Sequence, residues 1–360
     1  MKSVPGDTVC LADYERHFHK MVDPAIAAYI SGPAADGFSR ARNRDQFQRY
    51  MLMPKVLADL REATAASTLF GVDLAYPIIL APTAYHQLVD PHGEVATAHA
   101  AGLTKTWMTV SLLSSVSLEQ IAASATAPLW FQLYLQADRA ESLVLARRAE
   151  EAGYAAIVVT VDAPVTAMRN EQQRAGFVLP PSIRPVNLDG LTGAAPVRAV
   201  SGSPVFQGML RQSSRWEDIA WLREQCRLPI LLKGVLNAED AERAIALGID
   251  GIIVSNHGGR VLDSLPSALD VLPAICGRVA GRIPVIADGG IRRGTDIVKA
   301  LALGARAVLV GEPVLHALAV GGADGLAHML TILQTEFEAA MAVIGCATLA
   351  DIDHSVLLSV

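Results

Sequence analysis

EEAGYAAIVVTVD (150–162) sets a pattern that the chain repeats in IALGIDGIIVSNHG (245–258) and LALGARAVLVGEP (301–313). In each stretch an alanine-rich helical segment ends at a glycine, and a short apolar run follows. The three glycines are Gly153, Gly248 and Gly304. Each stands where a left-handed residue ends a helix without a steric penalty from a Cβ atom. Apolar runs spaced by helix-length segments are typical of parallel strands covered by helices.

The same pattern extends over most of the chain and gives eight strand candidates. They are residues 78–82, 106–111, 129–135, 155–162, 229–235, 251–256, 283–290 and 307–311. Asn237 and Thr295 precede helical segments, where an N-cap side chain would accept hydrogen bonds from free backbone N–H groups. Eight βα units favour an α/β fold of the closed (β/α)8 TIM-barrel type. An open doubly wound sheet is the alternative.

Two regions fall outside this alternation. Residues 1–77 precede the first barrel strand, and we expect them to form helices and a β-hairpin that cap the barrel. Residues 176–215 are rich in proline, glycine and serine, follow the fourth strand, and are predicted to be a long mobile lid rather than a disordered loop. Because an α/β barrel with insertions often reaches this length, residues 1–360 are predicted to be a single domain.

Composition narrows the class of function. Hydrophobic residues make up 51% of the chain and charged residues 18%, which suits a large buried core. The formal net charge is −6 and no run of lysine or arginine occurs, so we expect no nucleic-acid partner and no binding to anionic membranes. A small-molecule substrate is favoured.

Cysteine usage and the amino-terminal sequence predict the compartment. The cysteines Cys10, Cys226, Cys276 and Cys346 lie far apart, with neither a disulfide framework nor the spacing of a metal site. No stretch approaches the roughly 18 apolar residues of a membrane span, and no signal-peptide core is present. The expectation is a soluble, cytoplasmic protein without a bound metal.

Polar side chains gather where the predicted strands end. They are Ser111, Gln132, Tyr134, Thr160, Asp162, Lys233, Ser255, His257 and Asp288, followed by Gly289 and Gly290. In a barrel the carboxyl ends of all strands open at one mouth, so these residues are expected to lie close together. Each alone could merely satisfy backbone groups of a loop. Their occurrence on successive strands indicates a functional site.

One motif among these residues resembles a known family. SNHGGRVLD (255–263) resembles the signature of the FMN-dependent 2-hydroxy-acid oxidases and dehydrogenases, a family that includes glycolate oxidase, lactate oxidase and mandelate dehydrogenase. Supporting motifs occur in the family's order: YISG (29–32), APTA (81–84), FQLY (131–134), TVDAP (160–164), LLKGV (231–235) and ADGGIRRG (287–294). The resemblance spans nearly the whole chain and implies FMN as cofactor.

The resemblance also implies catalytic roles. His257 matches the active-site base, which suits imidazole because its ordinary pKa lies near neutral pH. Asp162 matches the aspartate paired with that base, whose carboxylate would stabilise the imidazolium. Arg169 and Arg260 match carboxylate-binding arginines, which can hold a carboxylate bidentately. The two tyrosines of the implied site are Tyr29, on the same carboxylate, and Tyr134, on the substrate oxygen.

The implied cofactor contacts form a second set. The family places the backbone of Pro82, Thr83 and Ala84 against the flavin ring. Side chains near the ring are Ser111, Gln132, Thr160, Lys233 and Ser255, with Lys233 at the N1–C2=O edge of the flavin. Asp288 would bind ribityl hydroxyls. The phosphate site after the last two strands would comprise Gly289, Gly290, Arg292, Gly311 and Glu312.

Two positions depart from the family pattern. Gly311-Glu312-Pro313 stands where family members commonly have Gly-Arg-Pro, and a carboxylate near a phosphate is unfavourable. Leu113 aligns with a tryptophan of glycolate oxidase, which would open the substrate pocket. Together with Tyr85 and His86 after APTA, this makes the chain most similar to aromatic-acid oxidases such as 4-hydroxymandelate oxidase.

The prediction for activity is oxidation of an aromatic (S)-2-hydroxy acid, mandelate or 4-hydroxymandelate, with dioxygen as acceptor and a homotetramer as the assembly. The chain has no spare stretch for a haem domain of about 100 residues. Alternatives are L-lactate or glycolate oxidation, and a dehydrogenase that reduces a quinone-type acceptor. Two further alternatives are another FMN or phosphate barrel, such as isopentenyl diphosphate isomerase, and a non-catalytic binding barrel, which Glu312 would favour.

Overall fold

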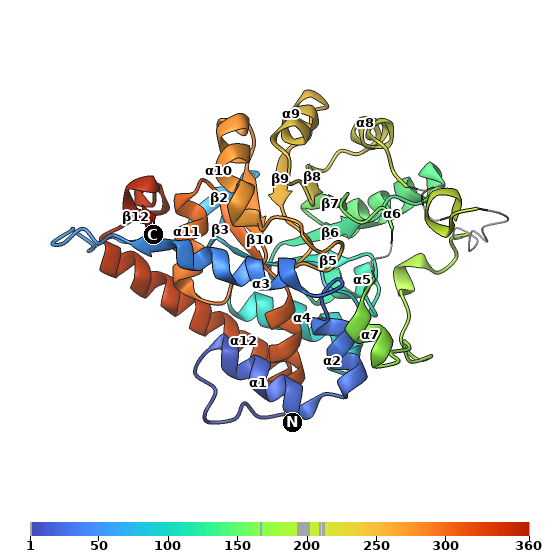
Figure 1. Ribbon diagram of the computed structural model, residues 1–360, viewed down its shortest axis with the longest axis horizontal. Coiled ribbons are helices and arrows are strands. Elements are labelled where there is room, and N and C mark those ends of the chain that lie inside the picture. Colours follow the sequence, from blue (N-terminus) through green and yellow to red (C-terminus); the bar gives the residue numbers. More distant parts are fainter. Residues whose placement is uncertain (1, 166–167, 193–201, 209, 211–212, 360) are drawn as a thin grey trace.

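The computed structural model describes residues 2–165, 168–192, 202–208, 210 and 213–359 (Figure 1). Eight parallel strands close into a barrel in the order β10-β11-β4-β5-β6-β7-β8-β9. The strands are β4 (Ile78–Leu80), β5 (Trp107–Ser111), β6 (Leu129–Leu133), β7 (Ala156–Thr160), β8 (Ile230–Lys233), β9 (Gly251–Val254), β10 (Val285–Asp288) and β11 (Ala307–Val310). The predicted barrel is confirmed, and closure excludes the open sheet.

Each barrel strand is followed along the chain by one or two α-helices (Figure 1). They are α4 (Gly93–Leu103), α5 (Leu118–Ser124), α6 (Arg139–Glu151), α7 (Asn170–Arg174), α8 (Trp216–Gln225), α9 (Ala238–Ala246), α10 (Ala268–Val279), α11 (Gly294–Ala302) and α12 (Glu312–Ile344). Helix α12 bends at Gly322, whose backbone is not helical. None of the helices in the described ranges is long and apolar enough to cross a membrane.

The predicted helix ends are confirmed at the glycines. Gly153, Gly248 and Gly304 have φ angles of 85°, 73° and 106°, the left-handed conformation that glycine adopts without strain. Asn237 caps α9 by accepting a hydrogen bond from the backbone N–H of Glu239.

The N-cap prediction for Thr295 is wrong. Helix α11 starts one residue earlier, at Gly294, with Arg293 at the N-cap. The free N–H groups of Arg292 and Arg293 are instead satisfied by the carboxylate of Asp296, inside the first turn. A carboxylate in that turn also interacts favourably with the positive end of the helix dipole.

Residues before the barrel pack against both of its ends. The antiparallel hairpin of β2 (Ser67–Leu69) and β3 (Val72–Leu74) places Leu69 and Leu74 in one buried cluster with Trp107 and Trp130 from inside the barrel. This hairpin covers the amino-terminal end of the strands. Helices α2 (Pro24–Ser31) and α3 (Phe38–Asp45) lie at the carboxyl ends of the strands, and α1 (Leu11–Met21) packs against α12. The last strand, β12 (Leu357–Ser359), pairs with β1 (Tyr50–Leu52).

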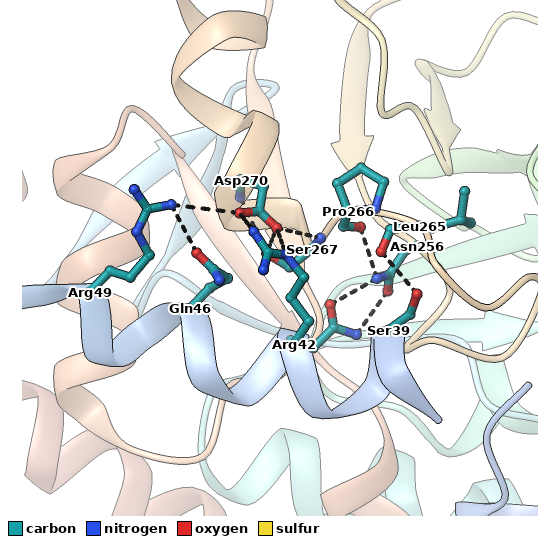
Figure 2. Close-up of polar contacts among 10 residues, drawn as sticks. Ser39, Arg42, Gln46, Arg49, Asn256, Leu265, Pro266, Ser267 and Asp270 are labelled. Atoms are coloured by element: carbon teal, nitrogen blue, oxygen red, sulfur yellow. Dashed lines mark hydrogen bonds and ion pairs between the residues drawn. The ribbon is translucent and has the colours of Figure 1, made fainter. Parts of the chain in front are cut away.

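Helix α3 is bonded to the loop that follows β9 and to the first turn of α10 (Figure 2). The guanidinium of Arg42 donates two hydrogen bonds of 2.8 Å to Asp270, and Ser39 Oγ donates to the carbonyl of Leu265. The buried amides of Asn43 and Asn256 donate to each other at 2.8 and 2.9 Å. Since Asn256 directly precedes His257, these contacts join the amino-terminal cap to the motif after β9.

Part of the predicted lid is fixed to the barrel. The buried side chain of Asn187 accepts a hydrogen bond from the N–H of Leu118 and donates to the carbonyl of Leu112 and to Ser114 Oγ. Residues 193–201, 209, 211 and 212 of the predicted lid lie outside the described residues. The mobility of the lid stays a prediction.

Candidate active site

A cavity of about 620 Å³ opens at the carboxyl ends of the barrel strands. All of the site residues predicted from the sequence line it except Asp162 and Ser255. Those two lie behind the wall, where Asp162 contacts His257 and Ser255 contacts Lys233. The structure therefore brings the whole predicted set together, although its members come from segments spread over most of the chain.

His257 and Asp162 form a close pair. Nδ1 of His257 lies 2.8 Å from Oδ1 of Asp162. Burial would raise the pKa of Asp162, but His257 and Lys233 outweigh it and hold the pKa below its usual range, so Asp162 is ionised at neutral pH. Because Nδ1 is engaged with the carboxylate, Nε2 is the ring nitrogen that can take a proton from a ligand in the cavity.

A glycine makes room for this pair. A Cβ atom on Gly234, which follows β8, would lie 2.4 Å from the Cβ of Asp162, and its φ of +107° already disfavours other residues. His257 itself has a φ of 59° and is held by a hydrogen bond from its N–H to Ser255 Oγ. A left-handed non-glycine residue costs free energy, and such strain is concentrated at functional sites.

The two predicted carboxylate-binding arginines differ in their surroundings. Arg260 donates to the backbone carbonyls of Tyr29, Ile30 and Gly32, at the end of α2, at 2.6 to 3.0 Å. Burial, with repulsion from Arg169, lowers its pKa to about 10, so it stays charged at neutral pH. Nε of Arg169 is buried and has no hydrogen-bond partner among the described residues. Arg169 thus has a free donor, whereas Arg260 also anchors α2.

Both predicted tyrosines lie in the cavity wall as neutral phenols. Burial raises the pKa of Tyr29, in spite of the nearby Arg260 and Arg169, and it also raises the pKa of Tyr134. Each O–H is therefore available as a hydrogen-bond donor at neutral pH. The ring of Tyr29 stacks on Phe177, with centroids 4.4 Å apart, which links α2 to the segment after α7.

Two buried polar atoms in this cavity show that it suits a polar ligand such as a flavin. Oε1 of Gln132 accepts from Ser111 Oγ and from the N–H of Leu112, which leaves Nε2 as a buried donor without a partner in the described part of the chain. Oδ1 of Asp288 is a buried acceptor in the same situation. Buried polar groups are normally paired, so a donor and an acceptor left open here fit a ring carbonyl and a ribityl hydroxyl.

Lys233 supplies positive charge beside these atoms. Its Nζ lies 2.8 Å from Oδ2 of Asp288 and donates to Ser255 Oγ at 2.8 Å. Burial alone would lower its pKa, but the nearby carboxylates of Asp288 and Asp162 outweigh this effect and raise the pKa above its usual value. The buried ammonium therefore stays charged. A fixed cation is suited to an electron-rich edge of a ligand.

The residues predicted for the phosphate site also line the cavity. Gly289 and Gly290 have φ angles of 91° and 82°, and a Cβ atom on Gly290 would lie 2.0 Å from the carbonyl oxygen of Asn43. Arg292 and Gly311 line the same cavity after the last two strands, and backbone N–H groups at glycines of this kind can approach an anion.

Sequence reasoning missed two cations at this end. Arg40 and Arg44, both on α3, line the cavity beside Arg292. Nη2 of Arg40 donates to Oε1 of Glu312 at 2.7 Å, and Nη2 of Arg292 donates to Oε2 at 2.6 Å. The high arginine content of FSRARNRD (38–45) was the available signal, but only the position of α3 shows where these side chains reach.

Such a fold and site define a barrel enzyme that binds a phosphate-bearing cofactor beside an acid–base pair. The FMN-dependent dehydrogenase family matches residues 18–359, and the chain belongs to this family and uses FMN. It is 46% identical to an L-lactate oxidase of Alicycliphilus denitrificans, over 96% of this chain and 95% of that protein. It is 42% identical to a peroxisomal (S)-2-hydroxyacid oxidase of Arabidopsis thaliana, over 91% of this chain and 90% of that protein.

A solved structure shares the architecture. A mandelate oxidase variant with (S)-mandelic acid superposes with a TM-score of 0.89 and 39% sequence identity, covering 98% of each chain. The resemblance to the 2-hydroxy-acid oxidases that the motifs indicated is thereby confirmed, and the isopentenyl diphosphate isomerase alternative is set aside.

Proposed function

We propose that this chain oxidises (S)-2-hydroxy acids to 2-keto acids and transfers the electrons to dioxygen, which becomes hydrogen peroxide. The substrate loses two electrons and two protons, and dioxygen takes up the same number. The observation that carries this proposal is the His257–Asp162 pair beside a cavity that Arg169 lines, and the buried Nε of Arg169 has no hydrogen-bond partner among the residues that the structure describes. The oxidase activity of the relatives supports it.

In this proposal His257 removes a proton from the substrate through Nε2. Asp162 is ionised and bonded to Nδ1, so it keeps the ring in one orientation and stabilises the imidazolium that forms. Arg169 and Arg260 hold the substrate carboxylate, while Tyr29 and Tyr134 donate to the carboxylate and to the substrate oxygen. Fixing the carboxylate sets the position of the Cα hydrogen, and orientation of this kind is a large part of catalysis.

The remaining cavity residues would hold the cofactor. Bound FMN supplies the acceptor for the two electrons of the substrate. Gln132 and Asp288 would pair their open polar atoms with it, and Lys233 would stabilise negative charge at the ring. Ser111, Thr160 and the backbone of Pro82, Thr83 and Ala84 would complete the ring contacts.

The test is anaerobic mixing of the purified protein with a panel of 2-hydroxy acids, followed by air. Loss of the oxidised-flavin absorbance with one of the acids, and its return with hydrogen peroxide on admission of air, is the expected result. Flavin that stays oxidised with every acid would contradict the proposed reaction. Bleaching that air does not reverse would point to the alternative with a quinone-type acceptor.

An aromatic substrate is supported by the side chain at position 113. Leu113 lines the cavity, and its side chain is smaller than the indole of the tryptophan with which it aligns in glycolate oxidase. The likeness to a mandelate oxidase structure agrees with this choice. L-Lactate is the second candidate, because the relative at 46% identity is an L-lactate oxidase. Equal or better turnover of lactate than of mandelate would favour it.

We predict that Leu113→Trp lowers kcat/KM for mandelate by about tenfold to a hundredfold, and affects glycolate much less. Burying a ring in an apolar pocket contributes about 1.5–3 kcal/mol, and the indole would take that space. Steady-state rates of peroxide formation measure the effect. Leu103→Trp, at an exposed position on α4, is the matched control. An unchanged ratio of the two efficiencies would show that Leu113 does not set the size of the pocket.

A further inference from the structure

The phosphate end of the cavity carries an unusual arrangement of charges. Glu312 is the first residue of α12, and its side chain is only 19% exposed. Its two oxygens are each bound by a different guanidinium, Oε1 by Arg40 and Oε2 by Arg292. This carboxylate stands where the family commonly has an arginine, so the site has lost one cation there and gained an anion.

Glu312 is ionised. Burial would raise its pKa, but the neighbouring His316, Arg292 and Arg40 lower it to about 2. Because burial lowers the pKa of His316 to about 3, that ring is neutral at pH 7. The two arginines therefore supply the positive charge that keeps the carboxylate ionised. A negative charge beside a phosphate repels it, so binding of FMN requires a compensating cation.

Arg40 is placed to be that cation. It lines the cavity, and its helix packs against a glycine of the predicted phosphate site, because a Cβ atom on Gly290 would lie 2.0 Å from the carbonyl oxygen of Asn43. The bonds of Asn43 to Asn256 and of Arg42 to Asp270 fix the position of α3 (Figure 2). An arginine has five N–H donors, and in the described residues the acidic partners of Arg40 both face Nη2, with Oε1 of Glu312 at 2.7 Å and Oε1 of Glu15 at 3.6 Å.

We propose that Arg40 binds the phosphate of FMN in place of the arginine missing from position 312, and that Glu312 positions Arg40 and Arg292 for this role. The phosphate site of this chain is thus completed from the amino-terminal cap, in addition to the loops of the barrel. This inference concerns the cofactor and does not depend on which 2-hydroxy acid is oxidised.

The test compares two ligands that differ only in the phosphate. The holoenzyme is dialysed to equilibrium against FMN in one series and against competing riboflavin in another. The affinity of the protein for each flavin is then measured from flavin fluorescence. Arg40→Met should lower the affinity for FMN by about 10- to 100-fold and the affinity for riboflavin by no more than about twofold. The reason is that a charge-assisted hydrogen bond to the phosphate is lost only with FMN. Arg42→Met, on the same helix but bonded to Asp270, should leave the FMN/riboflavin ratio unchanged.

A double variant separates phosphate binding from a merely structural ion pair. Arg40→Met/Glu312→Arg returns the cation to the start of α12 and should restore FMN affinity to within about tenfold of the wild type. Arg40→Lys keeps the positive charge and replaces Arg40→Met if methionine disturbs the fold of α3. This variant too should weaken the binding of FMN more than the binding of riboflavin. Equal losses for FMN and riboflavin, no loss at all, or a double variant that binds riboflavin but not FMN would each overturn the proposal.

Discussion

Replacing His257 by alanine should leave FMN bound and slow the reduction of the flavin by substrate by about 10²- to 10⁴-fold, the usual effect of removing a general base. Nε2 of this ring is the proton acceptor that the cavity offers next to an ionised carboxylate. Without it the hydroxyl proton would have to leave to water. Anaerobic stopped-flow mixing, which follows the loss of oxidised-flavin absorbance, measures this step apart from the reaction with dioxygen.

Backbone strain calls for a second variant at the same position. His257 has a φ of 59°, and asparagine tolerates the left-handed conformation better than alanine does. His257→Asn should therefore keep the local structure and still lose the rate, because an amide is not a base. His99→Ala, at an exposed position on α4, is the control. A rate within a few-fold of the wild type in both His257 variants would refute the assignment.

Arg260→Lys should reduce both substrate binding and stability. The guanidinium donates to three backbone carbonyls at the end of α2, and a lysine ammonium cannot reproduce that planar geometry. A lost hydrogen bond to a charged group costs about 1.5–3 kcal/mol, or roughly tenfold to a hundredfold in kcat/KM. A lower melting temperature should accompany the change, because α2 loses its anchor.

Arg169→Lys is the comparison that separates the two effects. The buried Nε of Arg169 has no partner in the described ranges, so this variant should weaken binding of 2-hydroxy acids with a much smaller change in melting temperature. Isothermal titration with a 2-keto acid product and thermal unfolding of the holoenzyme give the two readouts. Unchanged affinity for the product in both variants would contradict the role of these arginines in binding the carboxylate.

Much of the fold could be predicted because its signals are local. Gly153, Gly248 and Gly304 end helices through their own conformational freedom, and the apolar runs after them are strands because both of their faces are buried. The exact residues at which helices begin were harder to predict. Thr295 was expected to cap α11, but the helix begins at Gly294, and the carboxylate of Asp296 accepts hydrogen bonds from the N–H groups of Arg292 and Arg293.

Residue types at strand ends also located the site, since a barrel brings those ends to one mouth. What each residue does there depends on contacts that spacing does not encode. From the sequence, Glu312 is an unfavourable residue at the predicted phosphate site. Only the fold shows that Arg40, 272 residues away in the chain, is bonded to it. Gly234 likewise is one glycine among 28 until the structure shows Asp162 packed against it.

The sequence by itself determined the barrel, the positions of its eight strands and the set of polar residues at its mouth, because periodicity, glycine conformation and strand-end position are properties of short segments. Tertiary structure alone decided which nitrogen of His257 is engaged, that Arg260 also anchors α2, and that α3 brings Arg40 to Glu312. Those features arise from packing between distant segments, where the free energy depends on distances and burial that a linear sequence does not contain.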